Sequence, residues 1–217
     1  DGSGGVETYF FLDGSASSGD PVTLFPDSST LAFGDGKDFQ LIHNGTNTRL
    51  RNYTGNLEIT QYADDSDIIF ECDDGSGGTE TYFYLDGSAS SGNPITIFPD
   101  SSHLALGNDG TGDFYMTHDG SNTHIVNYTG DLKFTQNAND KDIVFSCDDG
   151  SGGNEPYFYL DGSVSSGSPF TIFPDNSRLC FGTSNDLRIV HDGSNSYIMS
   201  SGVGDLYIQQ HNDDKDL

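Results

Sequence analysis

The residues best placed to do chemistry are three histidines, His43, His118 and His191, which stand at equivalent positions of a repeating sequence. Each ends a short apolar alternation and is followed by Asn-Gly or Asp-Gly. Side chains alternate across a strand, so His43 is expected to share a face with Phe39 and Leu41. If that face meets the axis of a trimer, three imidazole rings converge and can hold a transition metal. We favour a plainer role, in which each strand-end histidine bonds a nearby backbone carbonyl.

Aspartate- and glycine-rich loops are the second set of candidates. The loop from Gly107 to Asp113 contains Asp109, and residues 73–77 have a similar composition. Such loops offer the oxygen ligands that Ca²⁺ takes, so Asp109 and Asp113 are candidate metal ligands. Neither loop has the EF-hand spacing, and the Gly-Gly-x-Gly-x-Asp repeat is missing. We therefore predict no cofactor, and keep Ca²⁺ or an axial transition metal as alternatives.

Carboxylates are numerous, with 34 Asp and Glu in 217 residues, and several recur in every unit. The recurring positions are Asp13/Asp86/Asp161, Asp27/Asp100/Asp175, Asp38/Asp113/Asp186 and Asp67/Asp142/Asp216. Most lie beside Gly or Pro, where Asp bonds the backbone of its own turn. A glycosidase needs one specific pair of carboxylates about 5–10 Å apart, and no repeat offers a distinctive pair. Phosphate-loop, zinc-protease and nucleophile-elbow motifs are also missing. The sequence predicts no catalytic residue and no enzyme.

These residues recur because the chain consists of three near-copies of one unit. Asp1-Gly2-Ser3-Gly4-Gly5 returns at residues 74–78 and 149–153. A fixed period of this size marks copies of one supersecondary unit. We divide the chain into repeat 1 (1–73), repeat 2 (74–148) and repeat 3 (149–217), the last incomplete at its C-terminal end. We expect these residues to belong to a longer, fibre-like chain.

Each repeat has the pattern of a series of short strands. Apolar alternations are separated by Gly, Pro, Asn, Asp and Ser clusters, and helix signals are nearly absent. In repeat 2 the expected strands are residues 82–85, 95–98, 103–106, 114–118, 124–128, 132–136 and 143–147. The Asx-Gly pairs predict hairpins with type I′ turns, which need positive φ at both central residues. The predicted fold class is all-β.

The composition indicates a thin hydrophobic core that is shared between several chains. Hydrophobic residues make up 33%, with 28 Gly and no Trp, while aromatic residues reach 12% and recur in register. Short strands leave unpaired edges, and a cyclic homo-oligomer covers them. We predict an intertwined homotrimeric β-fibre, with a string of small β-domains and a single-chain β-solenoid as alternatives.

Cys72, Cys147 and Cys180 are expected to be buried reduced thiols, because their odd count argues against a disulfide framework.

The net charge of −26 restricts the possible partners. An acidic surface repels nucleic acid and anionic membranes, and no run of about 18 apolar residues is present. We therefore expect neither nucleic-acid binding nor membrane insertion.

Two motifs resemble sequences common in tail-fibre and other virion appendage proteins of marine bacteriophages, including phages of cyanobacteria. The first reads Asp186-Leu187-Arg188-Ile189-Val190-His191-Asp192-Gly193-Ser194-Asn195-Ser196-Tyr197-Ile198, followed by Gly204-Asp205-Leu206-Tyr207-Ile208. The second runs from Asp142-Ile143-Val144-Phe145 through Asp149-Gly150-Ser151-Gly152-Gly153 to Tyr157-Phe158-Tyr159-Leu160-Asp161-Gly162. All three repeats carry both motifs. The resemblance implies a homotrimeric, β-rich shaft built of repeats.

The functional hypothesis is the structural shaft of a phage tail fibre or related virion appendage, which presents a distal host-binding tip. Its expected partners are itself, other virion proteins and host-surface glycans. Its expected location is the virion, assembled in the host cytoplasm and exposed extracellularly. One alternative is a bacterial surface adhesin or glycan-binding repeat protein, in which exposed tyrosines stack on sugars; the candidates are Tyr9, Tyr82, Tyr157, Tyr84 and Tyr159. A fibre-borne polysaccharide depolymerase is a third hypothesis, and it requires carboxylates unique to one repeat.

Overall fold

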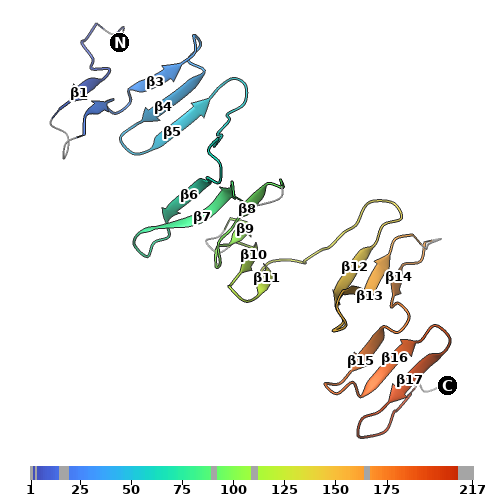
Figure 1. The fold of residues 1–217 in the computed structure, drawn as a ribbon. Coiled ribbons are helices and arrows are strands. Elements are labelled where there is room, and N and C mark those ends of the chain that lie inside the picture. The colour runs from blue at the N-terminus through green and yellow to red at the C-terminus, as the bar shows by residue number, and fades with distance from the viewer. Residues whose placement is uncertain are drawn as a thin grey trace. The chain divides into compact units, whose positions relative to one another are not determined.

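The computed structural model describes residues 2, 4–14, 20–88, 92–108, 112–163 and 167–209. Within these residues the protein has 17 strands and no helix (Figure 1). The predicted all-β fold class is thus confirmed. None of the described elements is a helix that could cross a membrane. The chain forms two units, Asp1–Val126 and Asn127–Leu217, each with its own sheets.

The strands are short and follow the same order in each repeat. The first eight are β1 (Phe11–Asp13), β2 (Val22–Leu24), β3 (Thr30–Phe33), β4 (Phe39–His43), β5 (Thr48–Asn52), β6 (Ile68–Asp73), β7 (Thr79–Asp86) and β8 (Ile95–Ile97). The others are β9 (Leu104–Leu106), β10 (Phe114–His118), β11 (Thr123–Asn127), β12 (Ile143–Asp148), β13 (Asn154–Asp161), β14 (Phe170–Ile172), β15 (Arg178–Phe181), β16 (Leu187–His191) and β17 (Ser196–Ser200).

Two kinds of three-stranded antiparallel sheet alternate along the chain. We call β6-β7-β8 and β12-β13-β14 the aromatic sheets, to which the β1-β2 pair is equivalent. We call β3-β4-β5, β9-β10-β11 and β15-β16-β17 the histidine sheets, because each carries one of the recurring histidines. The sequence boundary at Asp74 falls in the turn between β6 and β7. Each complete aromatic sheet therefore takes its first strand from the preceding repeat.

The Asx-Gly pairs do form hairpins, but the predicted turn type is wrong. β4 ends at His43 and β5 begins at Thr48, which leaves a four-residue loop. Gly45 has a φ of 88°, whereas Asn44 does not adopt positive φ. The side chain of Asn44 accepts the N–H groups of residues 46 and 47 at 3.1 and 2.8 Å. This Asx turn replaces the type I′ conformation that positive φ at both residues would have required.

Six of the seven strands expected in repeat 2 are present, and β10 coincides with the predicted residues 114–118. The expected strand at residues 132–136 is not formed, and residues 56–60 and 205–209 likewise lie outside any strand. The prediction was wrong at this point because no strand among the described residues lies beside the segment. A strand requires a hydrogen-bonded neighbour, which alternation alone does not supply.

The sheets are single layers without a hydrophobic core. No hydrophobic side chain among the described residues is buried. Within each unit, the strands make extensive contacts only with other strands of the same sheet. The expected burial of the cysteines is also wrong for this chain, because no layer covers Cys72, Cys147 or Cys180.

Candidate functional site: apolar sheet faces, turns and clefts

The backbone carbonyl of each histidine accepts a hydrogen bond from a tight turn in the preceding segment. Ser28 donates its N–H to the carbonyl of His43 at 2.7 Å, and Ser29 donates to Pro26 at 2.9 Å. Ser28 has a φ of 67°, which the third residue of a type II turn requires. The same bonds recur in the other repeats, at Ser101 with His118 and at Asn176 with His191.

The histidine rings face hydroxyl groups of the neighbouring strand. Nδ1 of His43 lies 3.1 Å from Oγ1 of Thr48. The equivalent distances are 3.3 Å for His118 and Thr123 and 3.1 Å for His191 and Ser196. The expected bond to a backbone carbonyl is therefore wrong. The reason is register: His43 and Thr48 are paired directly across β4 and β5, which brings the hydroxyl closest to the ring.

The described residues contain no group of three His, Cys, Asp or Glu side chains that would hold a metal ion. His43, His118 and His191 occupy three separate sheets. A metal on a symmetry axis would use one histidine from each of several copies, so the axial transition-metal site stays a prediction.

Of the two calcium candidates, Asp109 lies outside the described residues, as does Asp216 of the recurring set. The carboxylate of Asp113 lies against the backbone of Gly107, with Oδ2 2.6 Å from the position that a Cβ on Gly107 would take. Asp38 and Asp186 lie in the same way against Gly34 and Gly182. The carboxylate thus packs on its own turn in every repeat, and calcium binding stays a prediction.

Other recurring aspartates act as hydrogen-bond acceptors in turns. Oδ1 of Asp142 accepts the N–H of Gly162 at 2.9 Å, and Oδ1 of Asp161 accepts that of Ser163 at 2.7 Å. Asp67 and Asp86 repeat both bonds one unit earlier. The predicted role of bonding the backbone of the aspartate's own turn is confirmed for Asp161 and Asp86. Asp142 and Asp67 instead bond glycines that lie twenty residues further along the chain.

Asp119 has the most perturbed carboxyl group of the described residues. Nε2 of His124 lies 2.9 Å from Oδ2, while Asn122 and Ser121 donate their N–H groups to Oδ1 at 2.8 and 2.9 Å. These bonds, the one from His124 first, hold the pKa of Asp119 well below its ordinary value of 3.8. A general acid needs a raised pKa instead, so this environment serves the turn.

Three repeat-equivalent clefts contain the tyrosines that the sequence singled out. Their volumes are about 670, 430 and 680 Å³. In the second cleft Tyr82 is joined by Glu80 and Asp100. Tyr82 is the extra residue of a β-bulge, since Phe70 pairs with Phe83 and Glu71 with Thr81. Bulges re-aim side chains.

Sequence reasoning chose these tyrosines for their exposure and missed the cleft around them. The available signal was the recurrence of Glu-x-Tyr and Pro-Asp-Ser/Asn-Ser in all three repeats. Carboxylates accept hydrogen bonds from hydroxyl groups, and a tyrosine ring offers a flat apolar surface. The arrangement can therefore hold a polyhydroxylated ligand, although the clefts share the same carboxylates and none offers a distinctive pair.

The aromatic sheets carry a row of stacked rings across one face. The centroids of Phe70 and Phe83 are 4.5 Å apart, and those of Phe83 and Phe98 are 5.7 Å apart. The second aromatic sheet repeats the row with Phe145, Phe158 and Phe173, at 4.6 and 5.7 Å. These rings contact each other along the sheet, but no second layer covers them. The opposite face is apolar as well, with Ile69 and Val144 exposed.

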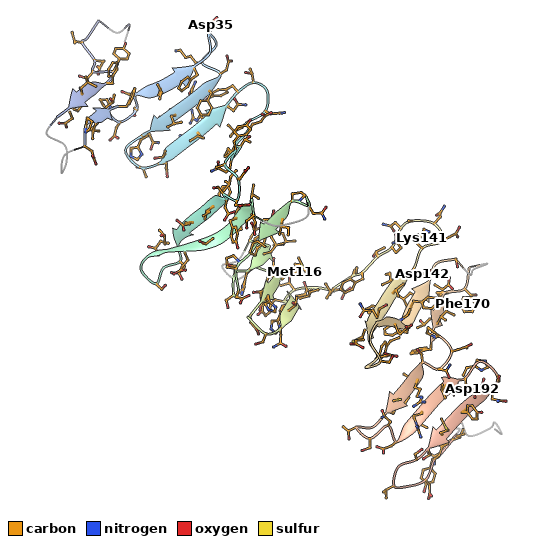
Figure 2. All side chains as sticks on the ribbon, in the orientation of Figure 1. Asp35, Met116, Lys141, Asp142, Phe170 and Asp192 are labelled. Atoms are coloured by element: carbon orange, nitrogen blue, oxygen red, sulfur yellow. The ribbon has the colours of Figure 1, made fainter. Side chains whose placement is uncertain are left out.

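The histidine sheets also leave one apolar face open. In the first of them Leu31, Leu41 and Leu50 are paired across the three strands and exposed. The equivalent row in the third sheet is Leu179, Ile189 and Ile198, which line a groove of about 480 Å³. Figure 2 shows apolar side chains on both kinds of sheet, for example Met116 on β10 of a histidine sheet and Phe170 at the start of β14 of an aromatic sheet. These open apolar faces are a candidate interaction surface of the described residues.

Comparisons with protein-family models, curated proteins and solved structures gave no match for this chain.

Proposed function

We propose that this protein is a structural protein whose fold is completed by association with further copies of itself. The absence of any buried hydrophobic side chain among the described residues carries this proposal. Both faces of the aromatic sheets and one face of each histidine sheet are apolar and exposed. Interfaces of obligate assemblies are rich in apolar surface, so these faces fit such an assembly.

The repeats favour a partner of the same kind. The aromatic and histidine sheets recur along the chain, so a partner must present matching surfaces at the same intervals. A second copy of the chain meets that requirement, and symmetric homo-oligomers are the commonest way to meet it. The net charge of −26 disfavours nucleic acid and anionic surfaces as partners.

The specific assembly that we propose is a homotrimeric β-fibre serving as the shaft of a phage tail fibre or related virion appendage. The sequence resemblance supports this assignment, and the uncovered sheets are compatible with a thin core shared between chains. In the virion the shaft would contact other virion proteins and present a host-binding tip to surface glycans.

Negative-stain electron microscopy of the 217-residue chain tests the fibrous character. The proposal predicts elongated particles of constant width. Compact globules in every field would contradict it.

Glycan binding along the chain is a second candidate, favoured by the three tyrosine-lined clefts. A neutral oligosaccharide would accept stacking on Tyr82 while its hydroxyl groups bond to Glu80 and Asp100. Saturation-transfer NMR with neutral and anionic oligosaccharides tests this function. It predicts signals for the neutral sugars that are reduced in the variant Tyr82→Ala, and the absence of signals for any sugar would contradict it.

A further inference from the structure

Three segments have strand-like sequences but no strand partner among the described residues. We call them the connecting segments, and they comprise residues 56–60, 131–135 and 205–209. They read Asn-Leu-Glu-Ile-Thr, Asp-Leu-Lys-Phe-Thr and Asp-Leu-Tyr-Ile-Gln. The described structure contains no turn or bend within them. Apolar residues take the second and fourth positions in each, which is the alternation of a strand with one covered face. Linkers that only span a gap are rich in Gly, Ser or Pro instead.

Side-chain hydrogen bonds hold both ends of the first two segments. Nδ2 of Asn127 donates to the carbonyls of Thr129 and Gly130 at 2.8 and 3.0 Å. At the other end, Oε1 of Gln136 accepts the N–H of Ala138 at 2.9 Å. Asn52 and Gln61 make the same bonds around residues 56–60. Between these fixed ends, the described residues supply no backbone hydrogen bond to the segment.

The apolar side chains of the connecting segments are exposed to solvent. Leu132 is 46% exposed and Phe134 is 63% exposed. Leu57 and Ile59 in the first segment, and Leu206 and Ile208 in the third, are exposed to a similar degree. A segment of this kind thus leaves both its backbone hydrogen-bonding groups and one apolar face without a partner among the described residues of its own chain.

We propose that the connecting segments are intermolecular strands, each of which pairs with a strand of a second copy of this chain. The inference rests on the proposed self-assembly and adds which part of the chain forms the joint. The segment recurs in every repeat, so its partner must offer strand edges at the same intervals. A second copy does so, because each sheet ends in edge strands such as β5 and β6. Pairing would bury the apolar side chains and satisfy the backbone groups at once.

Proline substitution separates a paired strand from a solvated linker. Proline has no N–H to donate to a ladder, yet it is tolerated in an extended linker. Glu58 and Lys133 occupy the polar positions of their segments, so their replacement keeps the apolar residues. Lys133 forms only an exposed pair with Asp131 at 3.8 Å. The test variant is Glu58→Pro/Lys133→Pro, and the matched control is Glu58→Thr/Lys133→Thr.

Sedimentation equilibrium of the 217-residue chain gives the first readout. The proline variant is expected to associate at least tenfold more weakly than the unmodified protein, and the threonine control is expected to associate as strongly. Equal association of both variants would overturn the intermolecular strands while leaving the self-assembly intact. A monomeric unmodified protein would overturn the proposed function together with this inference.

Hydrogen exchange of the unmodified protein gives a second readout that does not depend on folding of the variant. Amides of residues 131–135 are expected to be protected in the assembled protein and to lose protection on dilution to monomers. Exchange at the unfolded-chain rate within a proven assembly would overturn the inference.

Discussion

Gly162 donates its backbone N–H to Oδ1 of Asp142, 2.9 Å away and twenty residues earlier in the chain. The bond ties the end of β13 to the residues that lie between the turn at 139–140 and β12. Of these residues, Lys141 and Asp142 are labelled in Figure 2. Gly87 and Asp67 make the equivalent bond at 2.9 Å. Both contacts join the last residues of one repeat to the first strand region of the next.

The first prediction concerns the close approach at Gly162. A Cβ added there would collide with the backbone carbonyl of Lys141, whereas a Cβ on Gly14, at the same repeat position, would meet nothing within 4 Å. Gly162→Ala is expected to lower the free energy of unfolding by about 1–3 kcal/mol, the usual cost of overpacking. Gly14→Ala is the matched control and should leave it within about 0.5 kcal/mol. Urea unfolding measures both, and equal effects would refute the contact.

The second prediction uses the type II turns. Ser101 adopts a φ of 66°, and its equivalent Asn176 a φ of 69°. Asn tolerates this left-handed conformation better than Ser does, so Ser101→Asn should stabilise the protein by about 0.5–1 kcal/mol. The reverse variant Asn176→Ser should destabilise it to a similar extent. Thermal unfolding of the two variants is the measurement, and shifts of the same sign would be inconsistent with this explanation.

The third prediction is a pH dependence of the hairpin that contains Asp119. Its hydrogen bonds lower the pKa of Asp119 in the folded state. The unfolded state therefore binds the proton more readily, and the stabilisation is present above the ordinary value of 3.8 and lost as pH falls through the lowered pKa. NMR titration of the Asp119 carboxyl carbon should give a midpoint below 3.8. Asp119→Asn should remove this dependence while keeping the turn, since Asn44 makes the same two backbone bonds. A midpoint at or above 3.8 would show that these bonds are not made in solution.

The fourth prediction is that salt strengthens the self-association. Copies that each carry a net charge of −26 repel one another. Raising the ionic strength from 0.01 to 0.15 M shortens the Debye length from about 30 to 8 Å, which screens that repulsion while apolar burial is retained. The dissociation constant measured by sedimentation should fall over this range. A rise would indicate an assembly held by ion pairs between copies, contrary to the apolar interface proposed here.

The sequence predicted the short strands well because alternation and turn residues are local signals. β10 matches its predicted bounds, and the turn role of Asp86 and Asp161 is confirmed by their hydrogen bonds. The hairpin type was missed because the side chain of Asn44 competes for the backbone N–H groups, which dipeptide preference does not capture.

Other features depend on what lies beside a residue in space, and the sequence could not supply them. Residues 132–136 have the alternation of a strand, but strand formation also needs a neighbour, and the single chain offers none. The hydroxyl partner of His43 follows from the β4–β5 register, which depends on the length of the hairpin loop. The recurring Glu-x-Tyr pattern marks the residues around Tyr82, but the cleft itself depends on a bulge that follows from the pairing of β6 with β7.

The mass of the protein in solution tests most directly whether the uncovered sheets are completed by further copies of the chain. Light scattering coupled to size-exclusion chromatography of the 217-residue protein should give a multiple of three chains of 23.3 kDa each. An assembly whose number of chains is not a multiple of three would contradict the trimer but would still support self-assembly. A single species of 23.3 kDa at all concentrations would contradict the self-assembly itself.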